Sequence, residues 1–345
     1  MREGSAHLNA LVYMGPQHLE LQSLEQPQPK PGEAVIRVDA VGICGSELEG
    51  YMGHSSIRKP PLVMGHEFCG TIVKLAPDVA GLAEGDRVVA NPLIFCGKCD
   101  RCRQGRANIC RNRQIIGIHR PGAFAEYVAV PAGNLYRVPE NMEPELASLA
   151  EPLAVCLHAV KLALEPFGDA VIFGAGPIGM LTLQAALAMG ARRLLVIDKQ
   201  RERLRFARQL GAETAVPEEA DEGCRELFSS GVDTVIDCVG VQAVREQAIQ
   251  MINPGGTIVL VGLGQDRSQL SMNHVVRQEI SLIGSYTYSG TDFEQAVDLL
   301  VGGRITRERW STTCSLTNAA EVFARLANGT AEFSKYIINP REGRS

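Results

Sequence analysis

Two patterns of apolar residues divide this chain. Up to about residue 155, apolar and polar residues alternate over short segments that Pro and Gly interrupt. Residues 34–41 show the alternation most clearly, and because side chains two apart point to the same face of an extended chain, they predict a strand. Similar stretches at 70–75, 85–90 and 124–130 predict further strands. We therefore expect the first part of the chain to be mainly β-sheet.

Over residues 170–284 the pattern changes to alternating strands and helices. Compact apolar runs occur at 171–173, 194–197, 234–236 and 257–261. Such runs are typical of strands that are buried on both faces of a parallel sheet. Between two of these runs, Leu204, Ala207 and Leu210 have the spacing of one helix face, which Gly211 is expected to end. The alternation predicts an α/β domain with a doubly wound parallel sheet.

The overall composition is that of a two-domain enzyme. The chain has 345 residues, about twice the length of a typical domain. Its net charge of −5 gives no reason to expect a polyanionic partner such as nucleic acid. Residues 1–10 lack the apolar stretch of a signal peptide, and no later run is long enough to span a bilayer. Ten cysteines in a chain without an export signal favour metal ligands and buried thiols over disulfides, so we expect a cytoplasmic protein.

Four cysteines lie close together in the sequence: Cys96, Cys99, Cys102 and Cys110. A single tetrahedral metal ion can close such a loop. The main rival is an iron–sulfur cluster, whose common motif has three residues in the last gap and then a proline, whereas here the gap is seven residues and Arg111 follows. The spacing favours zinc. Because four thiolates leave no open coordination position, we expect this zinc to be structural.

A glycine-rich turn follows the apolar run 171–173. Gly174, Gly176 and Gly179 precede a predicted helix, where they permit a tight turn and let a dinucleotide pyrophosphate approach the helix N-terminus. Asp198 ends the next predicted strand, so its carboxylate can bind ribose hydroxyls and repel a 2′-phosphate, which favours NAD over NADP. The adjacent Lys199 weakens that preference. Further expected cofactor contacts are Pro177, Ile178, Val261 and Leu263.

Another set of metal-type residues lies in the first half of the chain: Cys44, His66 and Glu67, with Ser46 beside them. Taken singly, each has an ordinary explanation, such as a buried thiol, a core histidine or a surface acid. Together with the four-cysteine loop and the glycine-rich turn, they resemble the zinc-containing medium-chain alcohol and polyol dehydrogenases over nearly the whole chain. The matching segments are 42–46, 65–67, 85–88, 96–110, 122–127, 151–153, 174–179 and 254–256.

Glu151-Pro-Leu is most similar to the sorbitol, threonine and sugar-alcohol-phosphate dehydrogenases, because typical alcohol dehydrogenases of the family place a cysteine ligand there. The resemblance implies a Rossmann doubly wound sheet inserted into a GroES-like, mainly β catalytic domain. The implied boundaries are 1–154 for the catalytic domain with its zinc loop at 96–110, 155–286 for the Rossmann domain, and 287–345 for a segment that completes the catalytic domain. Within that last segment the pattern predicts a helix at 293–300 and a strand at 335–338.

The resemblance also implies a catalytic zinc. Cys44 and His66 would bind it, and Glu67 and Glu151 are alternatives for the remaining protein ligand, the other carboxylate holding a zinc-bound water. Three protein ligands and one exchangeable position are what a catalytic zinc requires. Such a metal lowers the pKa of the substrate hydroxyl, so that hydride can leave for the nicotinamide.

Three polar residues have implied roles around this chemistry. Ser46 matches the hydroxyl that passes the substrate proton onward. Relatives often carry a histidine three residues later, where this chain has Glu49, which is either the end of the relay or a solvated acid. Arg203 matches a basic residue near the cofactor ribose.

We therefore interpret the chain as an oxidoreductase that transfers hydride between NAD and a secondary alcohol in a polyol, sugar acid, sugar phosphate or amino alcohol. It would hold two zinc ions per chain and form a homodimer or homotetramer. The alternatives are a primary-alcohol or aldehyde-directed dehydrogenase, against which Glu151 argues, and a non-catalytic zinc or nucleotide-binding protein.

Loops 49–61 and 286–291 are expected to set specificity. Arg58 and Lys59 could meet a phosphate or carboxylate, but exposed, solvated bases are the simpler explanation.

Overall fold

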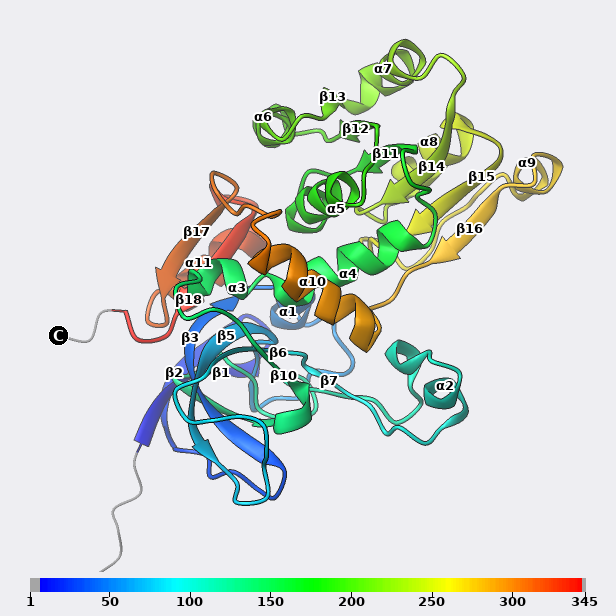
Figure 1. Cartoon of the computed structure of the whole chain (residues 1–345). Coiled ribbons are helices and arrows are strands. Elements are labelled where there is room, and N and C mark those ends of the chain that lie inside the picture. The colour runs from blue at the N-terminus through cyan, green and yellow to red at the C-terminus, as the bar shows by residue number, and fades with distance from the viewer. Residues whose placement is uncertain (1–6, 343–345) are drawn as a thin grey trace, which may run out of the picture. The chain divides into compact units, whose positions relative to one another are not determined.

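The computed structural model describes residues 7–342, which form two units (Figure 1). One unit combines Met1–Glu151 with Phe293–Ser345, and the other consists of Pro152–Asp292. The stretch 1–10, in which we expect no signal peptide, lies mostly outside the described residues. Across residues 7–342, no helix has both the length and the apolar character that crossing a membrane requires.

The first unit is built around the strand that the alternation at 34–41 predicts. This strand is β3 (Glu33–Gly42), and its sheet also contains β5 (Glu67–Leu75), β6 (Arg87–Ala90), β9 (Tyr127–Pro131), β10 (Leu135–Arg137), β17 (Ser311–Ser315) and β18 (Lys335–Asn339). The strand order is β10-β6-β5-β3-β18-β17, and β9 pairs with β3. Because β18 pairs antiparallel with β3, the C-terminal segment extends a sheet that the N-terminal segment begins.

Further strands and helices complete this unit. The remaining strands are β1 (His7–Gly15), β2 (His18–Glu25), β4 (Leu62–Val63), β7 (Leu93–Ile94) and β8 (Gln114–Ile115). The helices are α1 (Gly45–Tyr51), α2 (Asp100–Arg103), α3 (Pro144–Ala147) and α11 (Ala319–Ala327). Phe323 of α11 packs against Tyr51 and Phe124, with ring centroids 5.5 and 5.8 Å away. These rings join the C-terminal helix to the apolar core of the N-terminal segment. The turns around α2 project from the strands (Figure 1).

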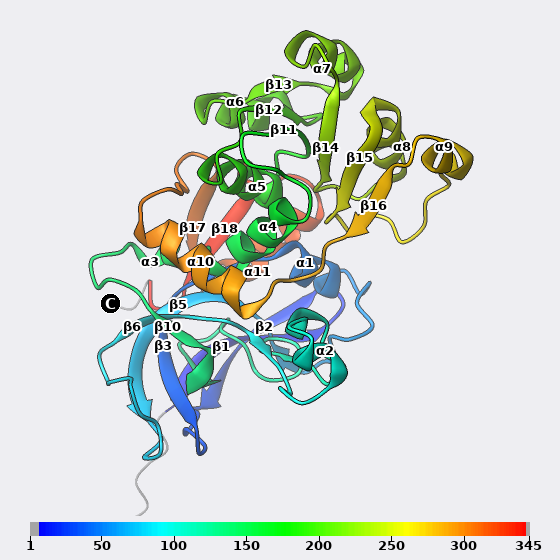
Figure 2. The same ribbon diagram turned by 45° about the vertical axis from the view of Figure 1, so that its right-hand side comes forward.

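The second unit has the predicted Rossmann fold. Its strands are β11 (Asp169–Phe173), β12 (Arg193–Ile197), β13 (Glu213–Ala215), β14 (Val232–Asp237), β15 (Ile252–Leu260) and β16 (Ser281–Gly284). They form one parallel sheet in the order β13-β12-β11-β14-β15-β16 (Figure 2). In such a sheet the order reverses between β11 and β14, and the carboxyl ends of these two strands are where dinucleotides bind.

The helices of the second unit alternate with these strands. They are α5 (Pro177–Ala188), α6 (Arg201–Gln209), α7 (Ala220–Leu227), α8 (Gln242–Met251) and α9 (Met272–Arg277). Leu204 and Ala207 of the predicted helix face are buried in α6, and Leu210 is the C-cap of this helix. The two crossings between the units fall inside α4 (Ala150–Lys161) and α10 (Gly290–Val301).

Candidate functional site

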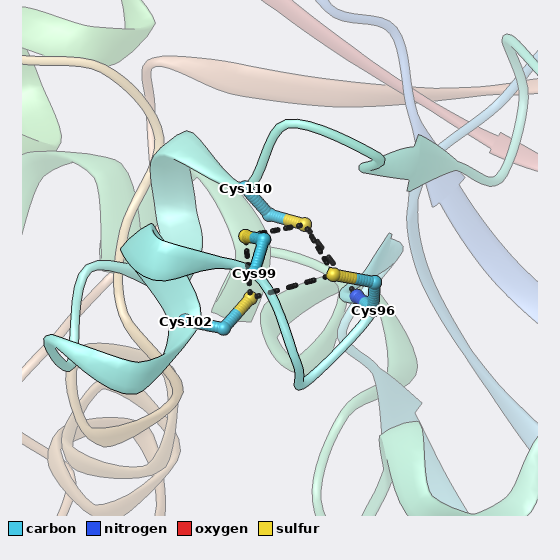
Figure 3. A group of neighbouring side chains, drawn as sticks. All are labelled: Cys96, Cys99, Cys102 and Cys110. Carbon is cyan, nitrogen blue, oxygen red and sulfur yellow. Dashed lines mark hydrogen bonds between the residues drawn. The ribbon is translucent and has the colours of Figure 1, made fainter.

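The four cysteines of the loop at 96–110 converge on one point, with their sulfur atoms facing one another (Figure 3). Their Sγ–Sγ distances are 3.5 Å for Cys96–Cys110, 3.5 Å for Cys99–Cys102, 4.0 Å for Cys96–Cys102 and 3.9 Å for Cys99–Cys110. A tetrahedron of sulfurs about 2.3 Å from a central zinc has edges of about 3.8 Å. All four thiols are free, so the donor set fits a closed zinc site rather than two disulfides.

Backbone N–H groups favour the thiolates of Cys96 and Cys99, whereas burial raises the pKa of Cys102 to about 12. Hydrogen bonds from the backbone N–H groups of Cys102 and Arg111 lower the pKa of Cys99 to about 6. Arg111 also donates two hydrogen bonds to Asp100, of 2.9 and 3.1 Å, which link the start of α2 to the residue after Cys110. The loop is thus held in place on both sides of the cysteines.

A second group of metal-type side chains lies where β3 and β5 meet α1. Cys44 is the N-cap of α1, and Glu67 is the first residue of β5 and pairs with the last residue of β3. Ligand atoms of Cys44, His66 and Glu67 lie within 4.8 Å of one another. His66 and Glu67 are buried, and Cys44 is half-buried. A thiolate, an imidazole and a carboxylate form a three-ligand set that suits a catalytic zinc.

Glu47 orients this group and was not expected from the sequence. Its carboxylate is fully buried and accepts hydrogen bonds from Cys44 N at 3.0 Å and Gly65 N at 2.8 Å. It also lies 2.8 Å from His66 Nδ1, which leaves Nε2 as the ring nitrogen that can bind a metal. Burial disfavours the imidazolium, but the charges of Glu47 and Cys44 raise the pKa of His66 well above its ordinary value. Glu47 and Cys44 therefore favour a positive charge at His66.

Lys335 is the other residue that the sequence did not reveal. It is the first residue of β18, is 2% exposed, and donates a hydrogen bond of 3.0 Å to Ile43 O. Its Nζ also forms an ion pair with Glu67 Oε2. Burial opposes the charge of Lys335, yet the carboxylate of Glu67 and the thiolate of Cys44 keep its pKa raised. This ion pair requires glycine at position 42, because an added Cβ there would collide with both Glu67 and Lys335.

Of the other residues expected in proton transfer or metal binding, Ser46 contacts the Cys44 group, whereas Glu151 and Glu49 do not belong to it. Glu151 is buried in the first turn of α4, and it is not part of the group of ligand atoms within 4.8 Å. Ser46 Oγ donates a hydrogen bond of 3.3 Å to Cys44 Sγ. Glu49 is exposed and pairs at 3.1 Å with His54, so in this structure it does not continue from Ser46.

The expectation that Arg58 is an exposed, solvated base is wrong. Only 5% of the residue is exposed, and its Nη2 donates a hydrogen bond of 3.0 Å to Ser46 Oγ. Lys59, by contrast, is exposed as expected. Arg58 is buried because its aliphatic part packs over Gly50 of α1, where an added Cβ would lie 2.5 Å from Arg58 Cδ.

In the second unit, the glycine-rich turn leaves room for a pyrophosphate. Gly174 has φ of +97°, and a Cβ at Gly179 would collide with the carbonyl oxygen of Gly174. A Cβ at Gly176 would meet only Arg203 Nη1, 4.0 Å away. Gly176 is also the N-cap of α5, so the open space lies at a helix N-terminus. The turn therefore fits a dinucleotide phosphate near the guanidinium of Arg203.

Asp198 follows β12 and ties this turn to it. Its Oδ2 accepts a hydrogen bond from Ala175 N and its Oδ1 accepts one from Gln200 N, both of 2.7 Å. Each carboxylate oxygen keeps a lone pair with which it can accept a hydrogen bond from a ribose hydroxyl. Among the other expected cofactor contacts, Leu263 is 81% exposed, and its side chain is therefore accessible to a ligand.

Comparisons with known proteins agree with both units. The model of the alcohol dehydrogenase GroES-like domain matches residues 30–140, and the model of the zinc-binding dehydrogenases matches residues 177–302. Together with the relative described next, these matches show that the chain belongs to the zinc-containing medium-chain dehydrogenases, a family of oxidoreductases. The resemblance seen in the sequence, and the combination of GroES-like and Rossmann domains that it implies, are confirmed.

Three individual proteins illustrate the range of the family. L-galactonate-5-dehydrogenase of Escherichia coli K12 is 32% identical over 336 residues, which cover 96% of this chain and 98% of that protein. The structure of a zinc-binding dehydrogenase from Sinorhizobium meliloti 1021 bound to NADP is 32% identical, with a TM-score of 0.90 and coverage of 97% and 100%. An alcohol dehydrogenase from Escherichia coli CFT073 complexed with NADH is 27% identical, with a TM-score of 0.90 and coverage of 97% and 99%. The family therefore includes binders of both NADH and NADP.

Proposed function

We propose that this protein is a zinc- and NAD-dependent dehydrogenase of secondary alcohols in polyols or sugar acids. The observation that carries the proposal is the group of Cys44, His66 and Glu67, whose three different ligand types suit an open zinc site beside a hydroxyl-bearing residue, Ser46. The relative from Escherichia coli K12 acts on L-galactonate, a sugar acid, which favours this substrate class over simple primary alcohols.

Two zinc ions per chain have separate roles in this proposal. Cys96, Cys99, Cys102 and Cys110 would hold a structural zinc, and the residues of the second group would hold a catalytic one. When bound there, zinc supplies Lewis acidity that lowers the pKa of an alcohol hydroxyl. A non-catalytic zinc-binding protein would need the first site only, so the buried second group argues for an enzyme.

The protein residues would orient the alcohol and move its proton. Ser46 lies one hydrogen bond from Cys44, so its hydroxyl can accept a hydrogen bond from an alcohol that binds beside Cys44 and, on taking up that proton, pass its own proton to water. Glu47 fixes the ring of His66, and Lys335 holds Glu67. We assign Glu67 as the third metal ligand because it lies in the group, and Glu151 as the carboxylate that exchanges with it or holds a water.

The assembly and the domain limits remain our proposals. We propose a homodimer or homotetramer in the cytoplasm, and the division at 1–154, 155–286 and 287–345. The ten cysteines support a reducing compartment, since all ten are free thiols.

The proposed function predicts NAD reduction by secondary alcohols. We expect NADH to form with at least one member of a panel of alditols, aldonates, sugar phosphates and threonine, and little to form with ethanol or other primary alcohols. A spectrophotometric assay of the purified protein, with and without a zinc chelator, is the measurement. If only primary alcohols reduce NAD, the enzyme is the alternative type of dehydrogenase; if no alcohol does, the chain is not a dehydrogenase of this class.

The cofactor preference depends on Asp198. We expect wild-type kcat/KM to be about 30-fold or more higher with NAD than with NADP, because a buried carboxylate close to the 2′-phosphate is a like-charge contact that costs several kcal/mol. Asp198→Ala should reduce this ratio, although it also frees the turn at Ala175. Asp233→Ala, which changes an exposed acid of the same unit, is the control. An equal or better wild-type kcat/KM with NADP would show that Lys199 and Arg203 outweigh the carboxylate.

A further inference from the structure

Arg58 is a buried cation beside the candidate metal group. It lies in the loop between α1 and β4, and 5% of the residue is exposed. Its Nη2 donates a hydrogen bond of 3.0 Å to Ser46 Oγ, and Ser46 Oγ donates one of 3.3 Å to Cys44 Sγ. The guanidinium is therefore two hydrogen bonds away from a candidate zinc ligand.

The charge of Arg58 has no direct partner in the part of the chain that the structure describes. Arg58 forms no ion pair with any of residues 7–342, and its Nε is buried without a hydrogen-bond partner. Burial opposes the charge of the Glu47 carboxylate, but His66 and, to a smaller extent, Arg58 lower its pKa. Glu47 already accepts hydrogen bonds from Cys44, Gly65 and His66. A buried charge without a partner is costly, and a bound anion would remove that cost.

The position of the guanidinium is fixed by packing. The aliphatic part of Arg58 lies over Gly50, so closely that an added Cβ would be 2.5 Å from Cδ. An immobilised guanidinium offers a planar set of donors that matches the oxygens of a carboxylate or phosphate, and binding such a group costs little further ordering.

We propose that Arg58 binds an anionic group, a carboxylate or a phosphate, on the alcohol that this site oxidises. The inference rests on the proposed function. An alcohol whose reacting hydroxyl contacts Ser46 carries its neighbouring substituents close to Arg58, because the two residues share a hydrogen bond. Arg58 thus selects sugar acids or sugar phosphates over neutral polyols of the same length.

The test compares three substrates that share a six-carbon skeleton: galactitol, L-galactonate and galactitol 1-phosphate. For the wild type we expect a higher kcat/KM with one of the two anions, and which anion it is distinguishes carboxylate from phosphate recognition. Arg58→Gln should lower the anion-to-galactitol ratio of kcat/KM by about 30-fold, as expected when one partner of a buried charge pair is removed. Arg58→Lys should lower it less. Lys59→Gln removes the adjacent exposed base and should leave the ratio unchanged.

A purely structural role of Arg58 predicts a different result, in which both substrate types lose kcat/KM in proportion and the ratio stays constant. That result would overturn the proposal. Gly50→Ala is a second variant in case Arg58→Gln fails to fold: the added Cβ displaces the guanidinium but keeps its charge, so the ratio should fall here too. An unchanged ratio in Gly50→Ala with a folded protein would count equally against the proposal.

Failure of the proposed function is distinguishable, because then no alcohol of the whole panel, these three compounds included, would reduce NAD. Anion binding can be measured without turnover by the rise in melting temperature that inorganic phosphate and L-galactonate cause. Under the proposal, one of them stabilises the wild type more than Arg58→Gln, and galactitol does not discriminate between the two proteins. Equal stabilisation of both proteins by every probe would overturn the assignment even if the enzyme is active.

Discussion

Glu67→Gln is expected to lose the catalytic zinc and about 1000-fold or more in kcat. An amide is a poorer zinc ligand than a carboxylate, and the Lewis acidity of a catalytic zinc is worth several kcal/mol, or a factor of ten for each 1.4 kcal/mol. The variant also leaves Lys335 buried without its carboxylate partner, so the free energy of unfolding should fall as well. Metal analysis, steady-state kinetics and denaturant unfolding measure these three effects.

Glu151→Gln distinguishes the role of Glu151 from that of Glu67. It should keep both zinc ions, the fold and the affinity for NAD, but lose about 100-fold in kcat, because the amide cannot accept a proton. Glu84→Gln, which changes an exposed acid of the same unit, is the control. Near-normal turnover of Glu151→Gln with full zinc would make Glu151 a bystander. Loss of zinc from Glu151→Gln together with its retention in Glu67→Gln would reverse the two roles.

Cys102→Ser is expected to remove the structural zinc. Three thiolates and a hydroxyl bind zinc far more weakly than four thiolates, and the folding energy of such a loop comes from the metal. We expect one zinc fewer per chain and a melting temperature lower by about 5 °C or more, since each kcal/mol shifts it by about 2–4 °C in domains of this size. The affinity for NAD should not change, because the glycine-rich turn belongs to the other unit.

The matched control for Cys102→Ser is Cys314→Ser. Cys314 is a half-buried thiol of β17 that belongs to neither group of candidate metal ligands. Its replacement should leave the zinc content unchanged. The same zinc content and melting temperature in Cys102→Ser as in the wild type would contradict a structural zinc at this loop.

The features that the sequence predicts are those whose partners are close in the chain or repeat with a simple period. The apolar run 171–173 and the glycines after it predict β11 and its turn, because a buried strand and a tight turn each leave their pattern within a few neighbouring residues. The cysteines at 96–110 are predictable for the same reason, since one short loop supplies all four ligands. Glu47 was also within reach: it follows the N-cap Cys44 by three residues, the spacing of a capping box.

Other residues of the site depend on contacts that no local pattern encodes. Lys335 reaches Glu67 across 268 positions of sequence, and only the pairing of β18 with β3 brings them together. Arg58 looks like an exposed base because arginine is rarely buried, and its burial follows from the absence of a side chain at Gly50. The sequence does not decide between Glu67 and Glu151 as third zinc ligand for the same reason, because the two residues lie on different elements whose relative positions no local pattern gives.

Activity as a function of zinc content tests the central claim most directly. Protein stripped by a chelator and reloaded stepwise is assayed for NAD reduction with the best alcohol of the panel, and bound zinc is measured at each step. The account predicts about two zinc ions per chain at full loading, with turnover that follows the filling of the group at Cys44, His66 and Glu67. Full turnover with one zinc per chain, or turnover that is indifferent to zinc, would contradict it.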